Sequence, residues 1–596
     1  MPLRLDRLTG STNGPLVRTL CFLLMSIAIV RHAAREFILG NVTSDMAHQF
    51  AAARAWIDGD GLQIPELATA SGSLVVHYLP LSGWPPGSSL LFAGVLSWTG
   101  DPWWALALIN LAGIALFFAS WFIILERLEP WLSPTSRIVF WVIWAFAWTP
   151  LHLMGTPGIL SQSLFSAAVA LTLWASSGKG GRVGVAAGLA AAASAWNRFA
   201  YIPLAFAPGL ASYLSITLGG TNQRERENLR RAYWFHIGTA TALIAALLLF
   251  QSFNSGHATY LSKRYELGAF GWQWSNLSRF CAFPLHLVGI PEFVDWSRSQ
   301  DFLRSFPLGL LGLGLSILIF SVAVAPLWRR WQESRTLDAA GDGMALRAFL
   351  LSGALTMVLT VGMLCALSLS VPLRAYAWAT DGWWTYVEEP RYFATFFPFL
   401  SLGWSCAIGD RLSPTRAQRS LPASKALGIL LLGTTLVAGT IVSNHHLLQE
   451  IHLGLAGEAP WSVRRHDDRK LYELLRESHR EGVQTFVVQE APHAQLAAYL
   501  QNPSVATAWR TGLMAGATPL PAADALDQPL VCENCAVFVA ALKDFPETGT
   551  PAGAVLAGRP GFKEVVELRD AAIFVLRRGD GTDPKRTKPA SSNPLP

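Results

Sequence analysis

The chain has 596 residues, of which 52% are hydrophobic and only 14% are charged, and its net charge is +6. Soluble globular domains carry about 25% charged residues, so this composition excludes an ordinary soluble protein and indicates a membrane protein. The basic residues stand in short clusters between apolar runs, as loop topology signals do. They do not form the continuous patch that nucleic-acid binding requires, so membrane lipids are expected partners and nucleic acid is not.

Apolar segments recur along most of the chain. Eleven of them approach the roughly 20 residues needed to cross a bilayer and are predicted to be transmembrane helices. They are residues 16–38, 102–125, 137–154, 158–176, 182–197, 199–218, 232–253, 306–327, 346–369, 391–410 and 425–443.

One further apolar segment, residues 88–100, is too short to cross comfortably and follows the sequence WPPG. If it lies along the membrane surface, the inner loops hold more Lys and Arg than the longer outer loops. If it crosses the bilayer, every later loop changes sides, and the excess of Lys and Arg moves to the outer loops. The positive-inside rule therefore predicts a cytoplasmic N-terminus and an interfacial helix over residues 84–100.

This topology places the loops 40–101, 254–305 and 370–391 on the outer side, together with the C-terminal part of the chain. In a bacterium the outer side of the inner membrane is the periplasm. The predicted location is therefore the inner membrane, with a periplasmic C-terminal domain.

The C-terminal part has a different character. Residues 446–578 contain helical patterns and strand patterns, such as QTFVVQE and AVFVAAL, which predict a small α/β domain. Within it, Cys532 and Cys535 make a weak zinc motif and, in an oxidising compartment, are expected to form a local disulfide. The polar, proline-rich residues 579–596 are predicted to be disordered. The predicted fold class is an all-α polytopic membrane domain, residues 1–445, followed by this α/β domain.

The charged residues that need an explanation stand at the outer surface. The interiors of the predicted spans contain almost no ionisable residues, apart from Arg31, Arg35 and Glu36 near the outer end of the first span. An ion-coupled transporter keeps such groups at membrane depth. The observed pattern suits an enzyme that takes one substrate from the lipid and another from the periplasm.

Three short motifs stand in this outer region. They are an acid-led helix that ends in WIDGDG, the following YLPLSGWPPG, and a late EEPRYFATFFPFL. In this order and on this side they resemble the GT-C superfamily, polytopic glycosyltransferases that take a sugar from a polyprenyl-phosphate carrier and include protein mannosyltransferases and lipid A aminoarabinose transferases. The resemblance implies an inverting transfer from a polyprenyl-phosphate-linked sugar donor to an envelope glycan, lipid or protein. In the mannosyltransferases two acids often stand side by side, whereas Met46 follows Asp45 here; the subfamily and any use of a divalent cation are left open.

Asp45 is the residue expected to act as general base, because an acceptor hydroxyl is a poor nucleophile until its proton is removed. The alternative is that Ser44 and Asp45 only cap the helix. His48, one turn along the same face, is a candidate either for lining the site or for packing. Asp58 and Asp60 are interpreted as a helix stop and turn, with metal or substrate contact as the alternative.

The leaving phosphate requires positive charge or hydrogen-bond donors at the outer surface. The first candidate is Arg391, beside Tyr392 in EEPRYF, with an interfacial anchor paired with Glu388 or Glu389 as the alternative. Arg198, in the tight outward turn between two spans, is the second. Lys263 and Arg264 are further candidates for the phosphate, with a solvated charge pair as the alternative. His77, Tyr78 and Glu389 are candidates for lining the site, with a structural role as the alternative for His77 and Tyr78.

Three other functions fit parts of this pattern. A polytopic glycan ligase or polymerase would also use a polyprenyl carrier, but it would concentrate essential Arg and His in one late loop. A lipid or glycan transporter would need charges or broken helices at the midplane. A scaffold would present the C-terminal domain without chemistry. A glycosyltransferase is preferred because the acid stands in the first outer loop.

Overall fold

The computed structural model describes residues 14–218 and 223–259 with short gaps, 270–272, 306–336, 343–372, 394–412, a few positions between 433 and 448, and strands between 484 and 578. The chain divides into two compact units. Unit 1 comprises Met1–Gln49 and Pro80–Ser462, and unit 2 comprises Phe50–Leu79 and Val463–Pro596. Unit 2 therefore combines a piece of the first predicted outer loop with the C-terminal part.

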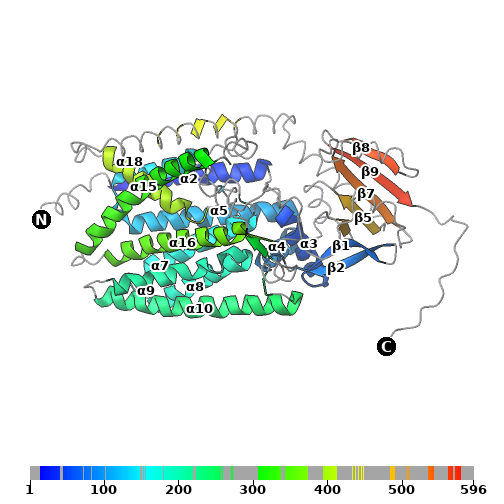
Figure 1. Ribbon diagram of the computed structural model, residues 1–596, viewed down its shortest axis with the longest axis horizontal. Helices are drawn as coiled ribbons and strands as arrows, with labels where there is room; N and C mark the ends of the chain where they lie inside the picture. Colours follow the sequence, from blue (N-terminus) through cyan, green and yellow to red (C-terminus); the bar gives the residue numbers. More distant parts are fainter. Residues whose placement is uncertain are drawn as a thin grey trace, which may run out of the picture. The chain divides into compact units, whose positions relative to one another are not determined.

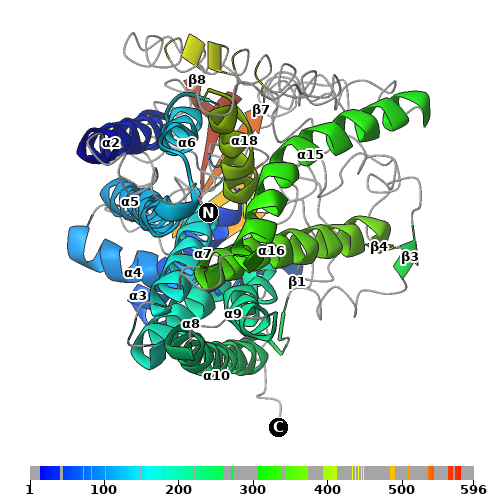
Figure 2. The same cartoon turned by 90° about the vertical axis from the view of Figure 1, so that its left-hand side faces the viewer.

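Unit 1 is a bundle of long helices, seen from the side in Figure 1 and from one end in Figure 2. Among the described residues, six helical segments are long and apolar enough to cross a membrane, and the chain is accordingly a polytopic membrane protein. The helices are α2 (Gly14–Leu39), α4 (Gly87–Thr99), α5 (Pro102–Arg127), α6 (Pro134–Phe146), α7 (Thr156–Ala175), α8 (Gly180–Asn197), α9 (Ala207–Thr217), α10 (Gln223–Ser255), α15 (Phe306–Thr336), α16 (Gly343–Leu369) and α18 (Phe397–Leu412). A further helix, α3 (Ser44–Asp58), continues across the division between the two units.

Prolines explain two departures from the predicted spans. Helix α6 ends at Phe146, well before the end of its predicted span, because Pro150 disfavours helical backbone at the residue before it. The predicted span 199–218 begins with two 3-10 turns, η5 (Phe199–Tyr201) and η6 (Leu204–Phe206), before α9 starts. Pro203, which has no N–H to donate, stands between these turns. The predicted span 425–443 lies outside the continuously described residues.

The core of unit 1 contains buried aromatic rings from α5, α6 and α18. Trp121 stacks on Phe140 with ring centroids 5.6 Å apart, and Nε1 of Trp144 donates a hydrogen bond to Oγ of Ser401 at 3.1 Å. A buried indole N–H needs an acceptor, and in this apolar bundle a serine of a neighbouring helix supplies it.

Helices α8 and α10 approach each other at small residues. A Cβ added at Gly184 in α8 would lie 2.6 Å from the carbonyl oxygen of Ala232 in α10, and one at Gly188 would lie 2.7 Å from the carbonyl oxygen of His236. Glycines one turn apart allow this backbone approach, as they commonly do between membrane helices.

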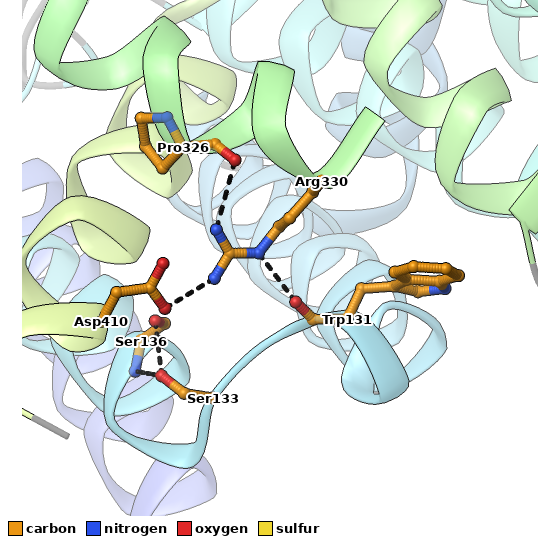
Figure 3. A network of polar contacts seen from close by, with 6 residues as sticks. All are labelled: Trp131, Ser133, Ser136, Pro326, Arg330 and Asp410. Carbon is orange, nitrogen blue, oxygen red and sulfur yellow. Dashed lines mark hydrogen bonds and ion pairs between the residues drawn. The ribbon is translucent and has the colours of Figure 1, made fainter. Parts of the chain in front are cut away.

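A buried polar network joins α15 and α18 to the segment before α6 (Figure 3). The guanidinium of Arg330 pairs with Asp410 at 2.8 Å and donates to the carbonyl oxygens of Trp131 at 2.8 Å and Pro326 at 3.3 Å. Beside it, the hydroxyl of Ser133 caps the N-terminus of α6. These bonds satisfy a buried cation and fix three parts of the bundle at one point.

The described strands of unit 2 form one seven-stranded sheet in the order β2-β1-β6-β5-β7-β9-β8. Strand β5 pairs in parallel with β6 and β7, and β9 pairs antiparallel with β7 and β8. The strands are β1 (Gln63–Ala70), β2 (Ser73–Pro80), β5 (Gln484–Gln489), β6 (Ala506–Ala508), β7 (Cys535–Leu542), β8 (Phe562–Glu567) and β9 (Ala571–Arg578).

This sheet contains two strands that the sequence did not predict. Strands β1 and β2 come from the first predicted outer loop, and β1 pairs in parallel with β6, with Glu66 opposite Thr507. The strands predicted at QTFVVQE and AVFVAAL are present as β5 and β7. The helices predicted between residues 469 and 501 lie outside the described residues.

Candidate functional site

The first turn of α7 contacts two of the segments that carry predicted site residues. Oγ1 of Thr156 donates a hydrogen bond to Sδ of Met46 at 3.6 Å. A Cβ added at Gly158 would lie 3.1 Å from Nη1 of Arg198, so the guanidinium rests against this turn. Thr156 and Gly158 are two positions apart at the N-terminus of α7. Thr156 contacts the helical turn that carries Asp45, and Gly158 contacts the side chain of Arg198.

Asp45 is the second residue of α3. The predicted helix is confirmed, and so is its glycine stop, because Gly59 and Gly61 follow it with φ angles of 92° and 83°, which L side chains rarely adopt. Position 45 lies in the first turn, where the helix macrodipole stabilises an ionised carboxylate. The side chain itself lies outside the described part of the chain, and the role of general base stays a prediction.

Arg198 stands in the predicted turn after α8. Its N–H donates to the carbonyl oxygen of Ser194 at 3.1 Å, and its carbonyl oxygen accepts from the N–H of Tyr201 at 2.9 Å. These bonds fix the turn on both sides, while the half-buried side chain reaches Gly158. A guanidinium beside a helix N-terminus is an arrangement that favours an anion.

A buried side-chain bond anchors the same turn. The hydroxyl of Tyr201 donates to Oε1 of Gln162 at 2.9 Å. Gln162 lies four residues after Gly158, so both belong to one face of α7. This face of α7 therefore positions the Arg198 segment through two contacts one helical turn apart: Gly158 contacts the Arg198 side chain, and Gln162 binds Tyr201.

His48 is buried and packs its ring against Trp84, with ring centroids 4.7 Å apart. The segment that carries Trp84 is held by Gln251 of α10, whose Nε2 donates to the carbonyl oxygens of Leu81 at 3.0 Å and Trp84 at 3.2 Å. His48 thereby fixes the first half of α3 to unit 1. A direct role of His48 in the site stays a prediction.

The predicted helix over residues 84–100 is present as α4. A Cβ added at Gly87 would lie 2.4 Å from the carbonyl oxygen of Trp196, and Oγ of Ser88 donates to Oδ1 of Asn197 at 2.7 Å. The first turn of α4 therefore packs on the residues directly before Arg198.

The other predicted phosphate ligands lie outside the described residues: Arg391, Tyr392, Lys263 and Arg264, and with them Glu389. The two outer loops that carry them are nevertheless joined. Strand β3 (Phe270–Trp272) pairs antiparallel with β4 (Ser370–Pro372), with Gly271 opposite Val371. This short ladder joins the two loops at residues 270–272 and 370–372.

His77 and Tyr78 are successive residues of β2 in unit 2. Successive positions of a strand belong to opposite faces of the sheet, so the pair as a whole does not belong to one surface. Asp58 is the last residue of α3, which agrees with its interpretation as part of the helix stop, and it forms an ion pair with Arg54, four residues before it, at 3.5 Å.

Metal binding was left open by the sequence. Within the part of the chain that the structure describes, no group of three or more His, Cys, Asp or Glu side chains could hold a metal ion. These residues therefore supply no ligand set for a divalent cation.

Four neutral residues of this region were missed by sequence reasoning: Thr156, Gly158, Gln162 and Gln251. A search for ionisable groups at membrane depth passes over them. In the sequence these four positions can be recognised as small or polar residues inside an apolar segment. A hydroxyl or amide there needs a hydrogen-bond partner within the protein, just as a charge does.

No protein-family model matches the chain, and no curated protein matches it. Several solved structures do match the chain. The chain is similar to ArnT from Cupriavidus metallidurans bound to undecaprenyl phosphate, at 13% identity and a TM-score of 0.48, over 95% of this chain and 98% of that chain. The apo state of that ArnT matches at 12% identity and a TM-score of 0.49 over the same shares. The apo oligosaccharyltransferase of Archaeoglobus fulgidus matches at 13% identity and a TM-score of 0.45, over 88% of this chain and 69% of that chain.

The structures similar to this chain thus include an ArnT and an oligosaccharyltransferase, the kinds of protein that the sequence motifs resemble.

Proposed function

We propose that the chain is a glycosyltransferase that moves a sugar from a polyprenyl-phosphate carrier to an envelope glycan, lipid or protein on the periplasmic side of a bacterial inner membrane. The observation that carries the proposal is the contact of α7 with both the turn that holds Asp45 and the guanidinium of Arg198. The reaction needs a base for the acceptor proton and a cation for the leaving phosphate. The proposal is supported because one helix terminus contacts both the helical turn that carries the candidate base and the side chain of the candidate cation.

In this mechanism Asp45 takes the proton of the acceptor hydroxyl. The acceptor oxygen attacks the anomeric carbon opposite the phosphate and forms the new glycosidic bond. The bond from the anomeric carbon to the phosphate oxygen breaks, polyprenyl phosphate leaves with the electron pair, and the configuration inverts. Arg198 and the N-terminus of α7 favour the charge that grows on the phosphate. Arg391, Tyr392, Lys263 and Arg264 are proposed as further phosphate ligands, and His48 and Glu389 as residues that line the site.

The pairing of β1 with β6 supports the proposed topology. Two strands can pair only on the same side of a membrane, so the chain between residue 80 and residue 484 must cross an even number of times. The eleven predicted spans give ten crossings in that interval, whereas a crossing by residues 88–100 would give an odd number. The proposal accordingly has the C-terminal domain, residues 446–578, on the periplasmic side together with the first outer loop.

The test is transfer of labelled sugar from lipid-linked donors of host membranes to the envelope fraction, catalysed by the full chain. Asp45→Asn is expected to leave expression and thermal unfolding unchanged and to reduce transfer by roughly 100-fold or more, the contribution of a general base. Ser44→Ala is the matched control, because it removes the hydroxyl of the alternative, a helix cap, and leaves the acid. Transfer at the wild-type rate by Asp45→Asn would contradict the proposed mechanism.

A further inference from the structure

A buried carboxamide stands one helical turn after Asp45. Gln49 has an exposed fraction of 2%, and among the described residues neither its Oε1 nor its Nε2 has a hydrogen-bond partner. Positions 45 and 49 are four residues apart and share one face of α3. Buried amides are normally satisfied, so Gln49 has two hydrogen bonds that a ligand can supply.

The helical turn that carries Gln49 is held by its neighbours. Met46 accepts the hydrogen bond from Thr156 at 3.6 Å, and His48 packs on Trp84. Both contacts lie within three residues of Gln49. The amide is therefore fixed where it is, and a rotation of the helix that would bring it to water would break both contacts.

A second buried carboxamide lies behind the same segment. Gln251 is fully buried, and its Nε2 donates to the carbonyl oxygens of Leu81 and Trp84, while its Oε1 has no partner in the part of the chain that the structure describes. Trp84 contacts His48, the residue directly before Gln49. Gln251 thus keeps the Trp84 segment in place against the helical turn that presents the Gln49 amide.

The chemistry of this amide differs from that of Arg198. A guanidinium only donates hydrogen bonds and carries charge, which suits a phosphate, whereas a carboxamide offers a donor and an acceptor in one plane. Neighbouring hydroxyl groups of a sugar ring also act as donor and acceptor, and they can use both atoms of the amide.

We infer that Gln49 binds the transferred sugar: its Oε1 accepts from one ring hydroxyl and its Nε2 donates to the next, one helical turn from the base. The inference rests on the proposed function and deepens it, since it assigns the sugar to α3 and the carrier phosphate to Arg198. Gln49 moves no proton; it determines which sugar the site accepts.

The experiment uses Gln49→Met in the full chain, because Met has a similar length and lacks both hydrogen-bonding groups. The expected result is a rise of about tenfold or more in KM for the lipid-linked sugar donor, as for a site that loses hydrogen bonds to substrate hydroxyls. Affinity for undecaprenyl phosphate without sugar should stay unchanged, and the unfolding temperature should not fall. The matched control is Thr172→Val, a buried polar-to-apolar change of similar shape near the other end of α7, which should alter neither constant.

An unchanged donor KM in Gln49→Met, with an active wild-type chain, would overturn this inference and leave the proposed function standing. Equal weakening of the donor and of undecaprenyl phosphate would also overturn it, because it would show a general structural effect. A wild-type chain that transfers no sugar from any lipid-linked donor would overturn the proposed function and this inference with it.

Discussion

Arg198 lies against Gly158, at a distance of 3.1 Å between Nη1 and the place where a Cβ would stand. A Cβ at position 158 already requires the guanidinium and the Met154 side chain, at 3.0 Å, to shift by a few tenths of an ångström, and the branched side chain of valine requires a larger shift. For Gly158→Val we expect the KM for the lipid-linked donor to rise roughly 10- to 100-fold, the effect of losing one charge-assisted hydrogen bond of about 1.5–3 kcal/mol. Steady-state kinetics with varied donor check this.

Gly238→Val is the control for that prediction. A Cβ added at Gly238, on the exposed face of α10, meets nothing within 4 Å, so this variant should keep the wild-type KM. A normal KM in Gly158→Val would show that the position of Arg198 does not matter for the donor.

Arg198 and Arg391 are predicted to meet the same phosphate from distant parts of the chain. Each single change to Ala should weaken use of the donor, and the double variant should lose less than the sum of the two effects, because residues that share one partner are energetically coupled. A double-mutant cycle on kcat/KM measures the coupling. Strict additivity would place Arg391 away from the phosphate that Arg198 binds.

The ion pair between Arg330 and Asp410 is expected to stabilise the fold without a part in the chemistry. Asp410→Ala leaves the buried guanidinium without its counter-charge and should destabilise the protein by about 3–5 kcal/mol. The double change Arg330→Met with Asp410→Leu should recover much of this, because an apolar pair replaces the buried charges. Thermal unfolding in detergent gives the ranking, and a double variant less stable than Asp410→Ala would contradict it.

The register of β1 against β6 can be tested by crosslinking. Glu66 and Thr507 are partners in that parallel pair, and neighbouring strands lie about 4.8 Å apart, within reach of a disulfide. Glu66→Cys combined with Thr507→Cys should crosslink under mild oxidation, which a protease cut between residues 80 and 484 would reveal on a gel. Leu67→Cys combined with Thr507→Cys is the control, since position 67 belongs to the other face of the strand, and equal crosslinking of both pairs would contradict the register.

The sequence was sufficient to place most helices of unit 1, because long apolar runs have few alternatives in a bilayer. The predicted span 199–218 is present as Phe199–Thr217, but the sequence did not predict the two 3-10 turns on either side of Pro203. It also missed pairing that depends on distant residues. Strand β1 contains Pro65 and Glu66 and has no clear alternation of its own; it becomes a strand through β6, more than 400 residues later.

The candidate site shows the same division. Asp45 and Arg198 could be named from their residue type and loop position. The contacts that relate them run through Thr156 and Gly158, which carry no charge, and Gln49 has no signal apart from its place one turn after an acid. Burial and missing partners are properties of the folded chain, and no local pattern reports them.

The two-part sheet of unit 2 has a consequence for biosynthesis. At roughly 5–20 residues per second, the ribosome finishes Thr507 on the order of half a minute after Glu66. Throughout that interval, the edge of β1 that later pairs with β6 has unpaired backbone N–H and C=O groups. Such an edge is a template for wrong pairing with other chains. Production of this protein should therefore be limited by aggregation of unfinished chains, and slower elongation should make the yield worse rather than better.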